Sequence, residues 1–307
     1  MEGADTGGRP ARPDALAVAA GLLSRALGAL PLAANRALGT LAGRLAWLAN
    51  GRPRRVAETN VGLCFPALGP RAGRALARAA LVEQGRALVE LGWCWHRPRA
   101  ELEARTLEVV GAARLEAALD DPRGTLLVTP HFGAWELATL VPASRRPLGY
   151  FYRPPRRTAL EPLLVAGRAN VGGEPMRLDA GGIREALRRL RAGGTVGILP
   201  DQEPDRDGGA FAPFFGVPAL TMTLLPKLAA RSGARVLFVA VERLAGGRGW
   251  RYHCLDPVGD VAAADPVAAA TAVNRSVEAC VAIAPAQYLW SYRRFRELPG
   301  GGRRPYR

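Results

Sequence analysis

The chain has 307 residues and 49% of them are apolar, which excludes a disordered protein and suits one large domain or two small ones. Its formal charge is +15, and Lys227 is the only lysine, so arginine carries almost all the positive charge. A basic surface attracts phosphate groups on nucleic acid or anionic lipid, or an acidic carrier protein. No motif of the familiar nucleic-acid-binding modules accompanies this charge, so we expect no nucleic-acid partner.

Cysteines and acids give no sign of a metal site. The four cysteines are Cys64, Cys94, Cys254 and Cys280. They form no C-x-x-C pair, their gaps fit no zinc pattern, and we expect reduced, mostly buried thiols, as is typical of the cytosol. Acids alternate from Glu203 onward as in a calcium loop, but an EF-hand starting there would have Phe214 where a twelfth-position acid is required. We therefore predict no metal and no cofactor.

The N-terminal fifty residues divide into two parts. Residues 1–14 are rich in Gly, Pro and charge, and we expect a flexible N-terminus there. Residues 15–50 are mostly Leu and Ala, interrupted by Arg25, Arg36 and Arg44, and their unbroken apolar run is shorter than the about 20 residues of a membrane-spanning helix. This pattern favours a helical anchor that lies in the membrane interface or spans it once. A soluble helical hairpin and a cleaved signal peptide are the alternatives.

The rest of the chain predicts alternating strands and helices. A helix is expected over 71–92, with Leu76, Ala80, Leu88 and Leu91 on one face. Strands are expected over 107–111, 124–130, 148–152, 195–200, 235–242 and 250–258. Helices are expected over 113–121, 158–169, 182–191, 220–231 and 267–284, with a short one from about Ala134 and an interruption of the 220–231 helix at Pro226. This alternation predicts an α/β fold with a mixed, largely parallel sheet flanked by helices.

One short stretch, TPHFGAWELA at 129–138, carries a candidate base. His131 follows a predicted strand directly, at the sheet edge where open α/β folds bind ligands. If Gly133 lets the chain turn back, Glu136 can hydrogen-bond one ring nitrogen of His131 and make the other a better base. That pair is a triad without its serine, so it suits a nucleophilic hydroxyl on the substrate. The alternative is a capped helix start with an ordinary polar histidine.

HFGAWE matches the H-x-x-x-x-[D/E] motif of the glycerolipid acyltransferase superfamily. Six further blocks stand in order around it, at 60–68, 91–98, 150–164, 181–202, 211–221 and 284–301. Together they resemble the late acyltransferases of lipid A biosynthesis, the lauroyl and myristoyl transferases, over roughly residues 15–302. The mycobacterial phosphatidylinositol mannoside acyltransferases share the superfamily motif and are the nearest alternative.

The resemblance implies an O-acyltransferase of lipid A and lipopolysaccharide biosynthesis at the cytoplasmic face of the inner membrane. The donor would be a long-chain fatty acyl group on acyl carrier protein, and the acceptor a hydroxyl of a Kdo-bearing, lipid IVA-type precursor. His131 would be the general base and Glu136 its orienting residue. Residues 51–302 would form the acyltransferase domain, after the 15–50 anchor and before a basic tail at 303–307. A non-catalytic, basic membrane-binding protein of the same fold is the alternative from another class.

The same resemblance places six residues on the substrate side. Arg153 belongs to a Y-R-P block after the 148–152 strand, and its guanidinium suits phosphates and carboxylates. Asp201 and Gln202 follow the 195–200 strand, near the same sheet edge as His131. The remaining three are expected to line an acyl-chain groove, with plain core packing as the alternative. They are Phe214, Phe215 and Gly216.

The C-terminal segment interleaves arginines with aromatic residues. Its arginines are Arg293, Arg294, Arg296, Arg303, Arg304 and Arg307. This mixture favours contact with a membrane–water interface or with the acidic carrier protein. His96 and His253 have no acid or nucleophile at a useful local spacing, and we interpret both as structural.

Overall fold

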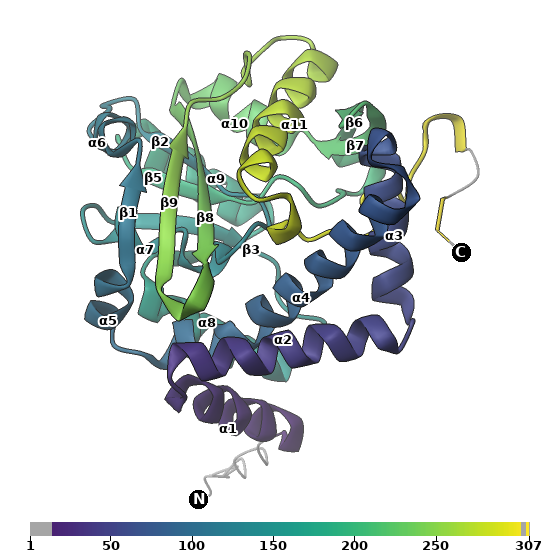
Figure 1. Cartoon of the computed structure of the whole chain (residues 1–307). Helices are drawn as coiled ribbons and strands as arrows, with labels where there is room; N and C mark the ends of the chain where they lie inside the picture. The colour runs from purple at the N-terminus through teal and green to yellow at the C-terminus, as the bar shows by residue number, and fades with distance from the viewer. Residues whose placement is uncertain (1–13, 302–304, 307) are drawn as a thin grey trace, which may run out of the picture.

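The structure, a computed structural model, describes residues 14–301, 305 and 306. Its centre is a seven-stranded sheet in the order β1-β9-β8-β2-β5-β3-β4 (Figure 1). The strands are β1 Thr106–Val110, β2 Thr125–Val128, β3 Leu148–Tyr152, β4 Glu174–Arg177, β5 Thr195–Ile198, β8 Arg235–Leu244 and β9 Gly249–Leu255. Every neighbouring pair is parallel except the β8–β9 hairpin. The predicted mixed, largely parallel α/β sheet is confirmed, although strand β4 was not predicted.

Helices cover both faces of this sheet because successive side chains of a strand point to opposite sides. Leu126 and Val128 of β2 join one apolar cluster, whereas Leu127 joins the other. The first cluster packs against α3 Arg52–Cys64, α9 Ala180–Arg191, α10 Leu224–Ser232 and α11 Pro266–Ile283. The second packs against α5 Arg99–Ala104, α6 Ala112–Leu119, α7 Leu140–Ala143 and α8 Glu161–Val171. The long helix α4, Gly69–His96, contributes to both clusters.

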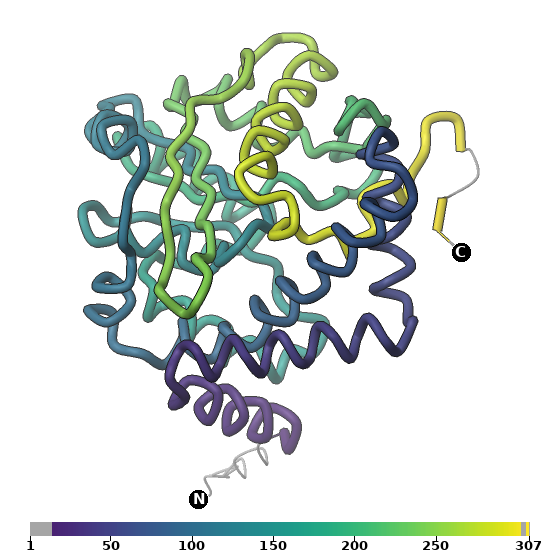
Figure 2. The backbone as a smooth tube through the Cα atoms, in the orientation of Figure 1, coloured from purple at the N-terminus to yellow at the C-terminus, as the bar shows by residue number. Residues whose placement is uncertain are grey.

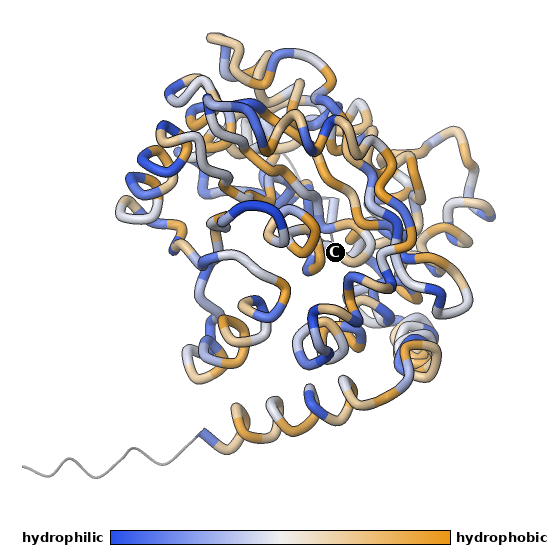
Figure 3. Tube along the Cα trace, turned by 90° about the vertical axis from the view of Figure 1, so that its left-hand side faces the viewer, coloured by the Kyte–Doolittle hydropathy of each residue, from blue (hydrophilic) through white to orange (hydrophobic). Residues whose placement is uncertain are grey.

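Two N-terminal helices pack on α4. They are α1 Ala15–Ala29 and α2 Leu32–Leu48. The α2 and α4 backbones come close at Gly39 and Gly85, where an added Cβ would collide with the other helix. In Figure 3, α1 lies along the lower edge with mostly apolar colours. Among the described helices, none has both the length and the apolar character needed to cross a membrane.

Two details of the predicted elements are wrong. Leu88 was expected on the packed face of its helix, but it is 55% exposed. The predicted 220–231 helix begins only at Leu224, and Pro226 lies in its first turn without interrupting it. The preceding residues form an antiparallel hairpin of β6 Gly209–Phe214 and β7 Val217–Met222. The positive φ angles of Phe215 and Gly216, 48° and 78°, close that hairpin, as tight hairpin turns require.

The chain ends lie partly outside the described residues. The predicted flexible segment 1–14 is described only at Asp14, which caps α1 by accepting hydrogen bonds from Leu16 and Ala17. Of the predicted tail 303–307, only residues 305 and 306 are described. The C-terminal segment returns to α3 (Figure 2), where the Tyr306 hydroxyl donates to Asn60 Oδ1 at 2.6 Å.

Candidate active site

The turn after β2 is fixed by hydrogen bonds on two sides. Gly133 has φ +53°, and a Cβ there would collide with the carbonyl oxygen of Val241 in β8. On the other side, the Gly133 N–H donates to Gln287 O at 3.0 Å, and Leu289 N–H donates to His131 O at 3.1 Å. The glycine therefore permits the sharp turn, and the two flanking segments hold His131 at the carboxyl end of β2.

His131 is paired with Asp201, which follows the neighbouring strand β5. The two Asp201 oxygens lie 2.8 Å from the backbone nitrogen and 2.8 Å from Nδ1 of His131. Burial opposes ionisation of Asp201, but the charge and hydrogen bonds of His131 outweigh it and hold the Asp201 pKa below its ordinary value. The Asp201 side chain is 3% exposed and that of His131 15%, so the histidine alone keeps access to solvent.

The second ring nitrogen of His131 faces Gln202. Its Nε2 lies 3.1 Å from Nε2 of the exposed Gln202 amide. A carboxylate at Nδ1 favours the tautomer with a proton on Nδ1 and a lone pair on Nε2, which then accepts from the amide. The arrangement leaves Nε2 as the nitrogen that can take a proton.

The predicted hydrogen bond between Glu136 and His131 is wrong. Glu136 lies in the short helix η2, Trp135–Leu137, and accepts two hydrogen bonds from Arg168 of α8, at 2.6 and 2.9 Å. Trp95 Nε1 donates a third at 3.4 Å. Burial opposes ionisation of Glu136, but Arg168 outweighs it and lowers the Glu136 pKa. The η2 turn directs the Glu136 carboxylate toward α8, and Asp201 instead forms the hydrogen bond to Nδ1 of His131.

The other predicted substrate-side residues separate in space. Arg153 is exposed and borders a cavity of about 600 Å³ beyond β3 and β5. Phe214 is 1% exposed and belongs to the core, so core packing, the alternative reading, explains its position. Phe215 is half-buried beside Trp290 and, with Gly216, forms the β6–β7 turn. An acyl-groove role for the last two stays a prediction.

A cavity of about 50 Å³ adjoins the Glu136–Arg168 pair and includes Trp135 and Tyr150 in its lining. A single water takes about 30 Å³ of liquid volume, so this cavity as it stands is too small for a long acyl chain. The larger cavity beside Arg153 has that capacity.

The four cysteines are free, buried thiols, as predicted. Burial raises the pKa of Cys64 and of Cys280 to about 12, so neither is a ready thiolate nucleophile. His96 bonds Ser24 Oγ at 2.9 Å, and His253 bonds Glu242 across the β8–β9 hairpin at 2.9 Å.

Arg294 corrects the expectation of a basic interface at the C-terminal segment. It is 2% exposed and donates to Leu220 O at 2.6 Å and to Thr221 Oγ1 at 2.8 Å. The guanidinium therefore links β7 to the C-terminal segment instead of facing a partner. Arg303, Arg304 and Arg307 lie outside the described residues.

The fold and these contacts define a class of protein. A carboxylate–histidine pair stands at the carboxyl edge of an α/β sheet, and among the described residues no serine, threonine or cysteine side chain bonds the histidine. Such a pair is equipped for group transfer to a hydroxyl that the substrate supplies.

Comparison with known proteins identifies the family. The family model described as bacterial lipid A biosynthesis acyltransferase matches residues 14–297, so the chain belongs to this family and is an acyltransferase. The chain is 31% identical over 265 residues to the lipid A biosynthesis palmitoleoyltransferase of Escherichia coli K12, covering 86% of this chain and 85% of that protein. It is 30% identical over 273 residues to the lauroyltransferase of the same strain, with 89% and 88% covered. The myristoyltransferase of that strain is 24% identical over 275 residues, with 88% and 82% covered.

Proposed function

We propose that this enzyme transfers a long-chain fatty acyl group from acyl carrier protein to a hydroxyl of a Kdo-bearing lipid A precursor. The His131–Asp201 contact carries the mechanistic part of the proposal, because it orients a base whose second nitrogen, Nε2, bears the lone pair that can take a proton. The family supports lipid A as the product class, in preference to a phosphatidylinositol mannoside.

The proposed reaction needs one base and no enzyme nucleophile. His131 Nε2 removes the proton of the acceptor hydroxyl, whose oxygen attacks the thioester carbonyl. The carbon–sulfur bond then breaks, and the imidazolium returns its proton to the departing thiolate, so an ester and a free thiol are formed. Asp201 fixes the tautomer and stabilises the imidazolium. Glu136 acts as a positioning residue, because its pair with Arg168 holds the turn against α8.

We place the acyl donor in the cavity of about 600 Å³ beside Arg153. Its apolar wall includes Ile183, Leu187 and Leu228. Its charged lining consists of three cationic side chains, Arg153, Lys227 and Arg231, and two acidic ones, Asp205 and Asp207. An apolar recess with a net positive charge at its edge suits a fatty chain that is attached to an acidic carrier protein. Its lining includes Arg153, which directly follows β3, and Pro204, in the loop after β5 that begins near Asp201.

We further propose that α1 and α2 rest on the cytoplasmic face of the inner membrane. More than half of the exposed large apolar side chains in the described chain lie on these two helices. They are Leu16, Val18, Leu22, Leu23, Leu38, Leu41, Leu45 and Leu48. Such a concentration favours an interfacial helix pair.

The test is acyl transfer by the purified full-length protein in detergent, with acyl carrier protein bearing fatty acids of several lengths. The acceptor is a Kdo-bearing tetraacyl lipid A precursor, and its mass is measured before and after incubation. We expect a gain of one acyl chain and release of one thiol per chain transferred. Thiol release with only free fatty acid as product, or acylation of another glycolipid in preference, would overturn the proposal.

A further inference from the structure

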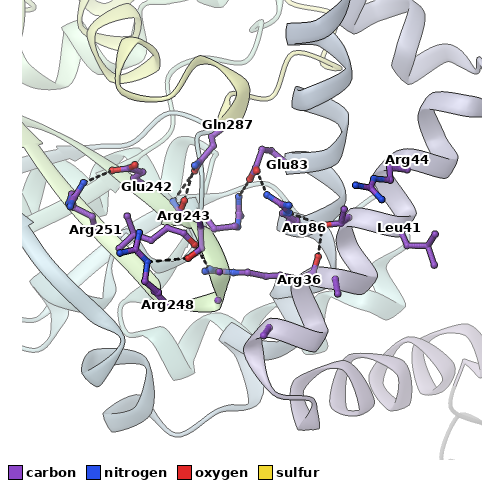
Figure 4. Close-up of a pocket in the computed structure, with 17 residues that line it drawn as sticks. Arg36, Leu41, Arg44, Glu83, Arg86, Glu242, Arg243, Arg248, Arg251 and Gln287 are labelled. Atoms are coloured by element: carbon purple, nitrogen blue, oxygen red, sulfur yellow. Dashed lines mark hydrogen bonds and ion pairs between the residues drawn. The ribbon is translucent and has the colours of Figure 1, made fainter.

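A second large cavity lies outside the residues used above. It has a volume of about 810 Å³ and is enclosed by α2, α4 and the β8–β9 hairpin with its short helix η5, Ala245–Gly247 (Figure 4). We call it the arginine cavity because six arginines line it, against two glutamates. The arginines are Arg36, Arg44, Arg86, Arg243, Arg248 and Arg251, and the glutamates are Glu83 and Glu242.

Only part of this positive charge is neutralised within the protein. Arg36 and Arg243 form the floor and share the buried Glu90, each at 2.8 Å. In contrast, among residues 14–301, 305 and 306, no carboxylate lies within ion-pair distance of Arg44 or Arg248. Both side chains are exposed, one on α2 and one at the end of η5. The two guanidinium groups lie at opposite ends of the recess (Figure 4), because Gly247, beside Arg248, lies close to Ala33 near the start of α2 and Arg44 lies near the end of that helix. Each has no acid partner in the described chain and suits an anion with several oxygens, such as a phosphate monoester.

The surface beside the arginine cavity is apolar. Arg36, Thr40 and Arg44 follow a spacing of four along α2 and face the cavity. The adjacent face of the same helix carries Leu38, Leu41, Leu45 and Leu48, which are 44%, 53%, 55% and 74% exposed. At about 100° per residue, the leucine face and the arginine face meet at Leu41, which also lines the cavity. A basic recess next to an apolar helix face matches a ligand with a charged head and fatty chains.

The arginine cavity is connected to the proposed active-site turn. Arg243 donates from its guanidinium to the carbonyl oxygen of Gly133 at 3.1 Å, two residues after His131. Gln287 lines the cavity and also accepts from the Gly133 N–H at 3.0 Å through its backbone oxygen. In the sheet, the arginine cavity lies on the β8–β9 side of β2, whereas the cavity beside Arg153 lies on the β5–β3 side. The strand that precedes His131 therefore lies between the proposed donor cavity and the arginine cavity, which has no function assigned so far.

We propose that the arginine cavity binds the head group of a membrane-embedded glycolipid that carries phosphate monoesters, and that Arg44 and Arg248, at the two ends of the cavity, are its principal phosphate ligands. This inference rests on the proposed function, since it assigns the cavity to the acyl acceptor. The lipid's own chains remain against the leucine face of α2, in the membrane. A recess of this size is typical of small-ligand sites, whereas a folded protein partner requires a broad, exposed surface.

The test is the vesicle preference of the full-length protein. Phosphatidylcholine vesicles are doped with phosphatidic acid, a phosphate monoester, or with phosphatidylglycerol, a diester, at amounts that give equal surface charge. We expect the wild-type protein to bind the phosphatidic acid vesicles about ten-fold more tightly, the size of one charge-assisted contact. In R44Q/R248Q this ratio falls to about one. A wild-type ratio of one, or a ratio that survives the double substitution, would overturn the proposal.

The matched control is R184Q/R191Q on α9, which also removes two exposed arginines without ion pairs in the described chain. This variant is expected to keep the ten-fold preference, because general attraction to an anionic surface treats both vesicles alike. An equal loss of preference in the control would show that net charge, not the cavity, is responsible. Inorganic phosphate added at low concentration is expected to leave the ratio unchanged; its collapse would point to a site for free phosphate.

One additional variant separates this proposal from the proposed function. H131A is expected to keep the full vesicle preference while it loses acyl transfer, because His131 does not line the cavity. If the wild-type protein transfers acyl groups to the lipid A precursor but shows no preference for phosphatidic acid vesicles, the proposed role of the arginine cavity is wrong and the proposed function is not affected. A preserved preference without any transfer by the wild-type protein would overturn the function and, with it, the acceptor role of the cavity.

Discussion

Two buried carboxylates at the same sheet edge, Asp201 and Glu136, have different partners. Both have a lowered pKa, and their side chains are 3% and 8% exposed. Asp201 pairs with a histidine, the side chain that most often acts as a general base, whereas Glu136 pairs with Arg168, whose guanidinium keeps its proton. The first pair is therefore suited to proton transfer, and the second is suited to holding the turn in place.

The largest effect is expected at His131. H131A removes the base and should lower the rate of acyl transfer by about 100- to 10,000-fold while the fold persists. The rate is measured on purified protein, with the circular dichroism spectrum and melting temperature as checks on folding. H96A removes another histidine, one bonded only to a surface serine among the described residues, and should transfer at nearly the wild-type rate. Near-full activity of H131A would exclude the mechanism.

A loss of about 100-fold is expected for D201N, because an amide no longer stabilises the imidazolium or enforces the tautomer. The fitting measurement is kcat at saturating donor and acceptor. D260N, a change of an exposed aspartate in the loop after β9 that lines neither cavity, serves as the control and should stay within about two-fold of wild type. If D260N and D201N lose equal activity, the loss of any carboxylate has this effect and Asp201 has no special role.

Breaking the Glu136–Arg168 pair should lower the free energy of unfolding more than it lowers the rate of acyl transfer. R168Q leaves Glu136 buried without its partner and is expected to lower the free energy of unfolding by about 3 kcal/mol, while R188Q at an exposed pair should cost below about 1 kcal/mol. Denaturant melts at neutral pH measure both.

The same pair predicts a pH dependence of stability. Because the folded-state pKa of Glu136 is lowered, the stabilisation that its carboxylate provides is present above the ordinary glutamate pKa and is lost as the pH falls through the folded-state pKa. E136Q should therefore flatten the acid limb of the stability curve, and an unchanged limb would contradict this assignment.

The smallest effect is expected for Q202A. The Gln202 amide occupies Nε2 in the substrate-free structure, and it must give up that hydrogen bond before an acceptor hydroxyl arrives. One such bond is worth about 1 kcal/mol, so the rate should change by less than about five-fold. A loss as large as that of D201N would mean that Gln202 takes part in the reaction itself.

Strand order could be read from the sequence only in part, and this explains the error at Glu136. The apolar strand before His131 and the one before Asp201 were both predicted, and both residues were placed near one sheet edge. Local spacing nevertheless favoured Glu136, because the sequence does not say that β5 lies directly beside β2 and brings together residues 70 positions apart. A long-range contact of this kind depends on sheet topology, which apolar patterns do not specify.

The arginines show the same limit in another way. A run of basic residues predicts an exposed surface, yet Arg294 is buried, because it finds oxygen partners on a segment distant in the chain. Composition reports the number of charges and not their partners. Gly133 was more informative, since the sequence suggested that the chain could turn sharply there, and the structure has that turn with a positive φ.

The most direct test of the central claim is a double-mutant cycle on acyl transfer with D201N, H131A and the combined variant. If Asp201 acts through His131, D201N should slow the wild-type enzyme about 100-fold and slow H131A hardly at all, because residues that act as a unit are not additive. If D201N slows H131A by the same factor as the wild-type enzyme, Asp201 acts independently, and the His131–Asp201 pair is not the catalytic unit.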